Sequence, residues 1–139
     1  MAKTKNKVLV DTNVFLWSLG GMKATEKLRD FFAERRNHDF YVSYVSAWEI
    51  SIKYGVGKLT LPLPPEIFFT DRLARSEFVG LPIELDHLVG VHRLPLIHRD
   101  PFDRLLISQA LRENMAVLTS DSEILKYDVK TIPFTDFIK

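Results

Sequence analysis

The chain has 139 residues, a formal net charge of +1 and no cysteine, and 46% of its residues are hydrophobic. This length favours a single domain over residues 1–139, and the hydrophobic content argues against a disordered chain. The absence of cysteine excludes a disulfide framework, a thiolate zinc site and a cysteine nucleophile, and it suits a reducing cytoplasm. No apolar run approaches the roughly 18 residues that cross a membrane, so no membrane role is expected.

The first half of the chain alternates short apolar runs with helical patterns. One apolar run ends at Asp11, and the next stops at Gly20-Gly21, as a short helix would. Apolar residues then recur at helical spacing among charges, and a segment rich in β-branched and aromatic residues follows. The expected elements are a strand at Lys7–Val10, helices at Val14–Leu19 and Thr25–Arg36, a strand at Phe40–Val45, and helices at Ala47–Tyr54 and Glu66–Phe78.

The second half continues the alternation and contains the clearest helix of the chain. That helix is followed by a compact apolar run, which is typical of a buried strand. The expected elements are a strand at Leu81–Leu85, helices at His87–His92 and Pro101–Asn114, a strand at Met115–Thr119, a helix at Ser122–Tyr127 and a strand at Val129–Ile132. Short apolar strands between helices predict an α/β fold, in which helices cover both faces of a parallel sheet.

Four acidic residues are expected near the carboxyl ends of the strands, where parallel sheets bind their ligands. Asp11 ends the first strand and Glu49 follows the second, while Asp103 opens the long helix and Asp121 follows the strand before the last. Crowded carboxylates repel one another, and a divalent cation removes that cost. Hard oxygen ligands without cysteine favour Mg²⁺ or Mn²⁺, which activate water and stabilise the leaving oxygen in phosphoryl chemistry.

Helix capping explains each of these acids separately. Ser46–Glu49 matches a capping box, with Ser46 as the N-cap, and Ser120–Glu123 matches a second one. Asp11 can cap the helix that follows it, because helix N-termini favour acidic residues. The capping interpretation and the metal interpretation therefore both remain open for the individual residues, and only the joint pattern favours the metal.

Two aspartates lie close together in "HRDPFDRLL", at His98–Leu106. If Asp100 is the N-cap of the long helix, Pro101 falls at its first position, where the missing N–H costs nothing. Asp103 then heads the apolar face of the helix, and a carboxylate that points inward needs a partner. We therefore expect Asp100 to be the cap and Asp103 to belong to the site.

The segments "VLVDTNVFLW", "SAWEISIKYGVGKLTLP", "HRLPLIHRDPFDRLLISQA" and "LTSDSEILKY" resemble the PIN-domain ribonucleases, and closely the VapC-type toxins of toxin–antitoxin pairs. The resemblance runs from about Val8 to Tyr127. It implies a three-layer α/β/α fold around a parallel sheet, and a Mg²⁺- or Mn²⁺-dependent endoribonuclease that cuts single-stranded or looped RNA. It further implies a cognate antitoxin that covers the acidic pocket, and a homodimer.

The family's functional residues carry over onto this sequence by position. The resemblance implies that three aspartates hold the metal, that Glu49 holds or orients the attacking water and binds any second ion, and that a hydroxyl group supports the acids. Three further residues flank this expected site and are candidate RNA contacts, although a loop at the surface explains them equally well. The residues are Asp11, Asp103, Asp121 and Glu49 as the acids, Thr12 and Ser120 as the supporting hydroxyls, and His98, Arg99 and Arg104 as RNA contacts.

Two other functions fit the sequence. A PIN nuclease that processes RNA without an antitoxin shares every feature above. A non-catalytic α/β binding module is the alternative outside the enzymes, and the four intact acids count against it.

Overall fold

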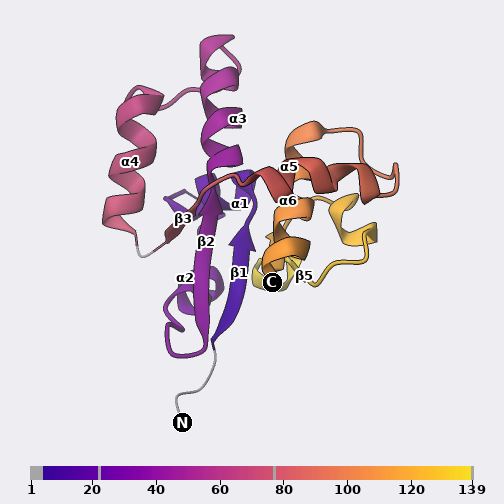
Figure 1. Cartoon of the computed structure of the whole chain (residues 1–139). Helices are drawn as coiled ribbons and strands as arrows, with labels where there is room; N and C mark the ends of the chain where they lie inside the picture. The colour runs from indigo at the N-terminus through magenta and orange to yellow at the C-terminus, as the bar shows by residue number, and fades with distance from the viewer. Residues whose placement is uncertain (1–4, 22, 77, 139) are drawn as a thin grey trace.

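Five parallel strands form the centre of the computed structural model, which describes residues 5–21, 23–76 and 78–138 (Figure 1). The strand order β3-β2-β1-β4-β5 places the first strand in the middle of the sheet. The chain therefore extends the sheet from β1 toward one edge first and toward the other edge later. The strands are β1 Asn6–Val10, β2 His38–Ser43, β3 Val79–Leu81, β4 Ala116–Thr119 and β5 Thr131–Pro133. The predicted parallel α/β sheet is confirmed.

Helices lie on both faces of the sheet and make it the middle of three layers. β1 shows why, because Val8 and Val10 contribute to one buried cluster and Leu9 to the other. The first cluster joins β1 and β2 to α1, α2 and α4, and the second joins the sheet to α6. The helices are α1 Thr12–Ser18, α2 Glu26–Phe32, α3 Tyr44–Gly55, α4 Pro65–Arg75, α5 Leu85–Val89 and α6 Pro101–Glu113, with 3₁₀ turns at Gly90–Arg93, Ile124–Lys126 and Phe134–Phe137.

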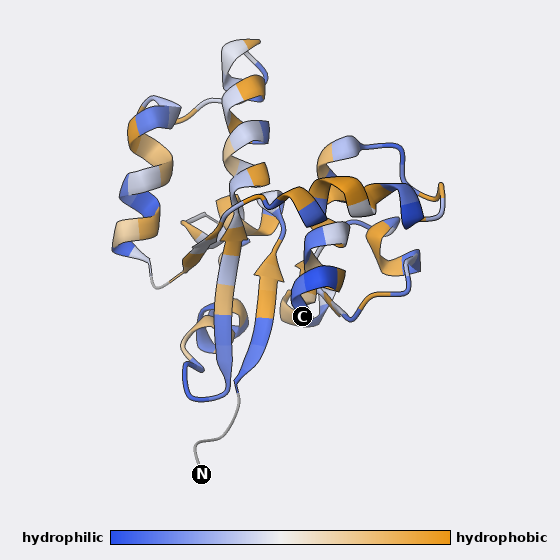
Figure 2. Ribbon diagram, viewed as in Figure 1, coloured by the Kyte–Doolittle hydropathy of each residue, from blue (hydrophilic) through white to orange (hydrophobic). Residues whose placement is uncertain are grey.

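The central strands begin polar and end apolar, as the hydropathy colouring of β1 and β2 shows (Figure 2). Val10 pairs with Val42 of β2 on one side and with Leu118 of β4 on the other. The chain then leaves the sheet at Asp11, whose N–H donates to the carbonyl of Leu118 at 3.0 Å. This register brings the carboxyl ends of β1, β2 and β4 to one level. Whatever follows these strands therefore gathers at one edge.

The boundary between β2 and α3 differs from the prediction. The strand covers His38–Ser43 instead of Phe40–Val45, and α3 begins at Tyr44. The Ser43 hydroxyl accepts a hydrogen bond from the Val45 N–H at 2.9 Å and caps the helix. A capping box with Ser46 as N-cap is therefore wrong, which places Glu49 inside α3.

Other boundaries shift by a few residues. The strand expected at Leu81–Leu85 instead ends at Leu81. Pro82 has no N–H with which to continue the hydrogen bonds between the strands. A single 3₁₀ turn replaces the helix expected at Ser122–Tyr127, and β5 lies at Thr131–Pro133 rather than Val129–Ile132. The helices expected to reach Arg36 and Phe78 end at Phe32 and Arg75. Within the described ranges, none of the helices is long and apolar enough to cross a membrane.

Candidate active site

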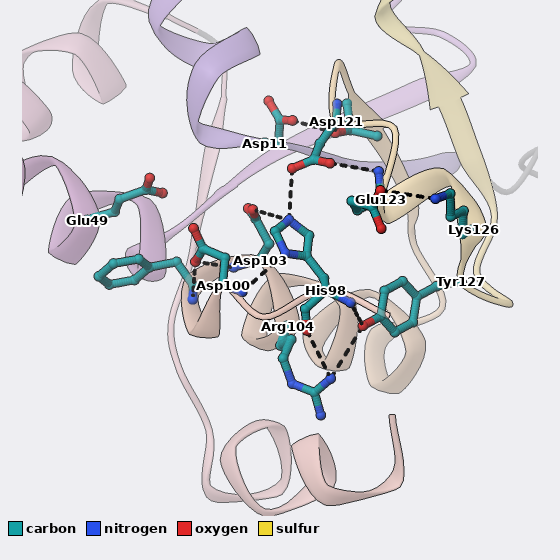
Figure 3. Close-up of polar contacts among 12 residues, drawn as sticks. Asp11, Glu49, His98, Asp100, Asp103, Arg104, Asp121, Glu123, Lys126 and Tyr127 are labelled. Atoms are coloured by element: carbon teal, nitrogen blue, oxygen red, sulfur yellow. Dashed lines mark hydrogen bonds and ion pairs between the residues drawn. The ribbon is translucent and has the colours of Figure 1, made fainter. Parts of the chain in front are cut away.

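One threonine joins the two aspartates that follow β1 and β4. The hydroxyl of Thr119 donates to Asp11 Oδ2 at 2.5 Å and accepts from the N–H of Asp121 at 2.9 Å. Asp11 is also the N-cap of α1, because its Oδ1 accepts from the Val14 N–H at 2.8 Å. Asp11 can therefore both cap a helix and belong to the acidic edge, where it lies beside Asp121 (Figure 3).

The start of α6 brings in the third aspartate. Asp100 is the N-cap, with Oδ1 accepting from the N–H groups of Phe102 at 2.8 Å and Asp103 at 3.3 Å. Pro101 occupies the first helical position. The prediction that Asp100 caps the helix is confirmed. Asp103 lies near the inner side of the helix start, and its side chain is 18% exposed.

The imidazole of His98 lies between two of these acids (Figure 3). Its Nε2 is 2.9 Å from Asp103 Oδ2 and 2.8 Å from Asp121 Oδ2. Its Nδ1 accepts a hydrogen bond from the N–H of Asp100 at 3.1 Å. His98 was expected to contact RNA, whereas the structure places it inside the acidic cluster.

Glu49 approaches the same space from α3. Figure 3 shows it across from Asp11 and Asp103, with its carboxylate turned toward the space between them. The side chain is only 7% exposed, and Oε2 accepts from Lys53 Nζ at 2.5 Å. The other oxygen, Oε1, is buried and finds no hydrogen-bond partner within residues 5–21, 23–76 and 78–138. A buried carboxylate oxygen without a donor is costly, so this atom is suited to a ligand that supplies positive charge.

Crowding and burial perturb the acids strongly. Burial and the charge of Asp100 raise the pKa of Asp103 to about 7 from its usual 3.8, although the charge of His98 acts to lower it. Burial also raises the pKa of Asp11, despite the hydrogen bonds that it accepts. Carboxyls that resist ionisation are the expected result of placing several acids in one partly buried space.

The contact between His98 and Asp121 shifts their two pKa values in opposite directions. Burial acts to raise the pKa of Asp121, but its hydrogen bonds with His98 and with backbone N–H groups, together with the charge of His98, outweigh this effect, so the pKa lies below its usual value. For His98, burial acts to lower the pKa, while the bond to Asp121 and the surrounding carboxylates raise it overall. The Asp100 N–H opposes that rise, because it donates to Nδ1 and so favours the neutral ring.

The two predicted supporting hydroxyls lie in different surroundings. Thr12 is buried and shares a hydrogen bond of 2.8 Å with the hydroxyl of Ser46, which ties α1 to α3. The side chain of Ser120 is exposed, and the hydroxyl that contacts Asp11 belongs to its neighbour Thr119. Sequence reasoning missed Thr119, although a polar residue that ends an apolar strand is a signal for a buried polar role.

The two arginines expected at the RNA also differ. Arg99 is exposed beside the cluster. The guanidinium of Arg104 donates to the carbonyls of Val91 at 3.2 Å and Pro95 at 2.9 Å, and to the hydroxyl of Tyr127 at 3.3 Å. Arg104 therefore holds the loop before α6 together instead of reaching toward the acids.

The residues fit a divalent ion. One carboxylate oxygen each of Asp103 and Asp121 and the Nε2 of His98 lie within 4.8 Å of one another. Asp11 and Glu49 lie outside this group at the same edge, and in the part of the chain that the structure describes one oxygen of Glu49 has no donor. Oxygen donors of this kind suit Mg²⁺ or Mn²⁺.

Comparison with protein families assigns the fold and the class. The PIN domain family matches residues 8–130, and the chain belongs to this family. Ribonuclease VapC16 of Mycobacterium tuberculosis is 36% identical over 70 residues, which are 50% of this chain and 48% of that protein. The similarity thus spans about half the length of this curated relative.

Solved structures share the architecture over nearly the whole chain. VapBC2 from Rickettsia felis, bound to a promoter DNA fragment, matches with a TM-score of 0.71 and 15% identity, covering 91% of this chain and 98% of that one. DNA-bound VapBC from Salmonella typhimurium matches with a TM-score of 0.68 and 16% identity, covering 93% and 98%. FitAcB from Neisseria gonorrhoeae matches with 0.63 and 19%, covering 92% and 98%. At these identities the likeness establishes the three-layer fold.

Proposed function

We propose that this chain is a Mg²⁺- or Mn²⁺-dependent endoribonuclease that acts as the toxin of a toxin–antitoxin pair. The observation that carries the proposal is that Asp11, Glu49, Asp103 and Asp121 lie near one another at one edge of the sheet, where a buried oxygen of Glu49 has no donor among the described residues. Membership of the PIN family and the partial identity to a ribonuclease support the reaction class.

The four acids have distinct roles in this proposal. Asp11, Asp103 and Asp121 hold the ion, and Thr119 keeps the first and last of them at a fixed separation. A bound divalent ion makes a water molecule more nucleophilic and neutralises the charge that develops on the phosphate. The buried Oε1 of Glu49 would orient a water molecule and take up its proton, while Lys53 holds the other oxygen.

Charge favours RNA as the substrate. Apart from the four acids at the ion, 19 Lys and Arg face 14 other Asp and Glu, which leaves +5 on the rest of the chain. A positive surface around a neutralised pocket attracts a phosphate backbone.

An antitoxin and a second copy of the chain are the proposed protein partners. The antitoxin is supported by two similar structures, a toxin–antitoxin complex from Klebsiella pneumoniae and a member of the VapBC family of toxin–antitoxin systems from Mycobacterium tuberculosis. The absence of cysteine is consistent with the proposed cytoplasmic location, where the RNA and the antitoxin are made.

Cleavage of RNA with and without chelator tests the enzyme directly. The purified chain is incubated with a pool of single-stranded and hairpin RNAs and Mn²⁺ or Mg²⁺, beside Asp103→Asn and the matched control Asp100→Ala. We expect cleavage by the wild-type protein that EDTA and Asp103→Asn abolish. Asp100→Ala loses a cap worth about 1 kcal/mol and keeps most activity per folded molecule. Cleavage that survives both EDTA and Asp103→Asn contradicts the proposal.

A further inference from the structure

His98 is held in the acidic cluster by several independent contacts. Its backbone N–H donates to the hydroxyl of Tyr127 at 2.7 Å, and its carbonyl accepts from Arg104 at 3.4 Å. The ring is 15% exposed and makes the two carboxylate contacts described above. The loop before α6 is thus built to present this imidazole to Asp103 and Asp121.

The hydrogen bonds of the ring define which nitrogen carries a proton. The Asp100 N–H points at Nδ1, so Nδ1 is the acceptor and the proton of the neutral ring is on Nε2. The protonated ring carries a hydrogen on Nε2 as well. In both forms Nε2–H faces two carboxylates and offers no lone pair to a cation. A histidine that ligates a metal usually donates its second N–H to an acceptor, and here the second nitrogen meets a donor instead.

We propose that His98 is an internal stand-in for the divalent ion, and that the ion binds by displacing Nε2–H from Asp103 and Asp121. This inference rests on the proposed function, because it concerns the same metal site. The N–H group and a cation compete for the same carboxylate oxygens, which lie close enough together to share either partner. The side chain satisfies the acids until an ion arrives, and it lowers the affinity of the site for that ion.

A role as metal ligand predicts the opposite effect of removing the ring. Loss of a ligand or of the group that orients it weakens metal binding by about 10- to 100-fold. Loss of a competing donor to charged carboxylates strengthens binding by about tenfold or more. The sign of the change in affinity therefore distinguishes the two roles without any measurement of catalysis.

Mn²⁺ binding to the full-length protein tests the inference. The dissociation constant is measured at one fixed pH from the EPR signal of free Mn²⁺, for wild type, His98→Ala and His98→Gln. His92→Ala is the matched control, because His92 is exposed on the neighbouring 3₁₀ turn. We expect His98→Ala to bind about tenfold more tightly than wild type, His98→Gln to fall between them because its amide retains an N–H donor, and His92→Ala to match wild type.

A spectroscopic readout accompanies the affinities. Long-range ¹H–¹⁵N spectra of the wild-type protein in EDTA should show the proton of the His98 ring on Nε2, and pulsed EPR of the Mn²⁺ complex should show no directly bound imidazole nitrogen. Weaker or unchanged binding in His98→Ala, or an imidazole nitrogen on Mn²⁺, overturns the stand-in role alone. Failure of wild type and all variants to bind Mn²⁺ overturns the proposed metal-dependent function together with this inference.

Discussion

Thr119 shows how a single uncharged residue arranges the acidic edge. Its hydroxyl donates a hydrogen bond to Asp11 and accepts one from the Asp121 N–H. It therefore holds in place two aspartates that follow different strands. The residue is fully buried, and water does not replace these contacts readily. Because this hydrogen bond also acts to lower the pKa of Asp11, the threonine positions a proposed metal ligand and partly offsets the effect of burial on that pKa.

Thr119→Val tests this arrangement. The substitution preserves shape but leaves Asp11 and the Asp121 N–H without their partner, so we expect a loss of about 1–3 kcal/mol in the free energy of unfolding. RNA cleavage per folded molecule should fall as well. Thr119→Ser restores the hydroxyl and should recover most of both. Equal stability of the valine variant and wild type in urea unfolding contradicts the bridging role.

The raised pKa of Asp103 makes the stability of the protein depend on pH. With a folded pKa of about 7 against 3.8, the folded state keeps a proton that the unfolded chain has already released. The contribution of this group is therefore fully present below about pH 4 and is lost as the pH rises through 7. In EDTA, Asp103→Asn should stabilise the protein by about 1–3 kcal/mol at pH 8 and hardly at all at pH 4.

Urea unfolding of wild type and Asp103→Asn at the two pH values measures this difference. The exposed Asp30 of α2 provides the matched control, since Asp30→Asn removes a carboxylate outside the cluster. A gain for Asp103→Asn that is the same at pH 4 and pH 8 shows that the raised pKa is not its cause.

At the scale of helices and strands, the sequence predicts the features that depend on residues close together in the chain. The alternation of apolar runs and helical patterns predicts the parallel sheet, and Asp100-Pro101 marks the start of α6. Tertiary contacts decide the rest. Ser43 and Ser46 are both plausible caps, and only the bond from Ser46 to Thr12, 34 residues away, assigns Ser46 elsewhere.

The sequence also does not predict which side of a strand each residue faces. Thr119 and Ser120 are adjacent hydroxyls, and which one faces Asp11 depends on how β4 sits against β1. The same holds for β2, whose polar start resembles a turn. His38 joins the strand because it pairs with Asn6 in register. Neither contact is encoded within a short window of sequence.

The end of α6 allows an element-scale prediction. Asn114 caps the helix in the left-handed conformation, with φ 55° and ψ 52°. Asn114→Ala should cost about 1 kcal/mol, because a Cβ without a local polar group is strained there. Asn114→Gly should be neutral within a few tenths of a kcal/mol, measured by thermal or urea unfolding. If alanine and glycine are equally stable, the left-handed cap does not govern the end of the helix.

For the whole molecule, metal binding and folding should be coupled. The proposed ligands come from α3, α6 and the ends of β1 and β4, so only the folded chain presents them together. An ion at 100 times its dissociation constant should add about 2.7 kcal/mol to the free energy of unfolding. Calorimetry with Mn²⁺ and with EDTA should show a higher Tm for wild type in Mn²⁺ and a much smaller shift for Asp103→Asn. The same shift in both proteins would place the ion elsewhere.

The bridge through Thr119 also bears on the order in which a ribosome makes the chain. Asp11 emerges early, but its partner follows 108 residues later, on the strand that completes the middle of the sheet. A nascent chain that lacks β4 already contains Asp11, Glu49 and Asp103, but it has no assembled edge. Under the proposed function, an unfinished copy has no complete site for RNA cleavage, and the topology itself delays that activity until synthesis has passed β4.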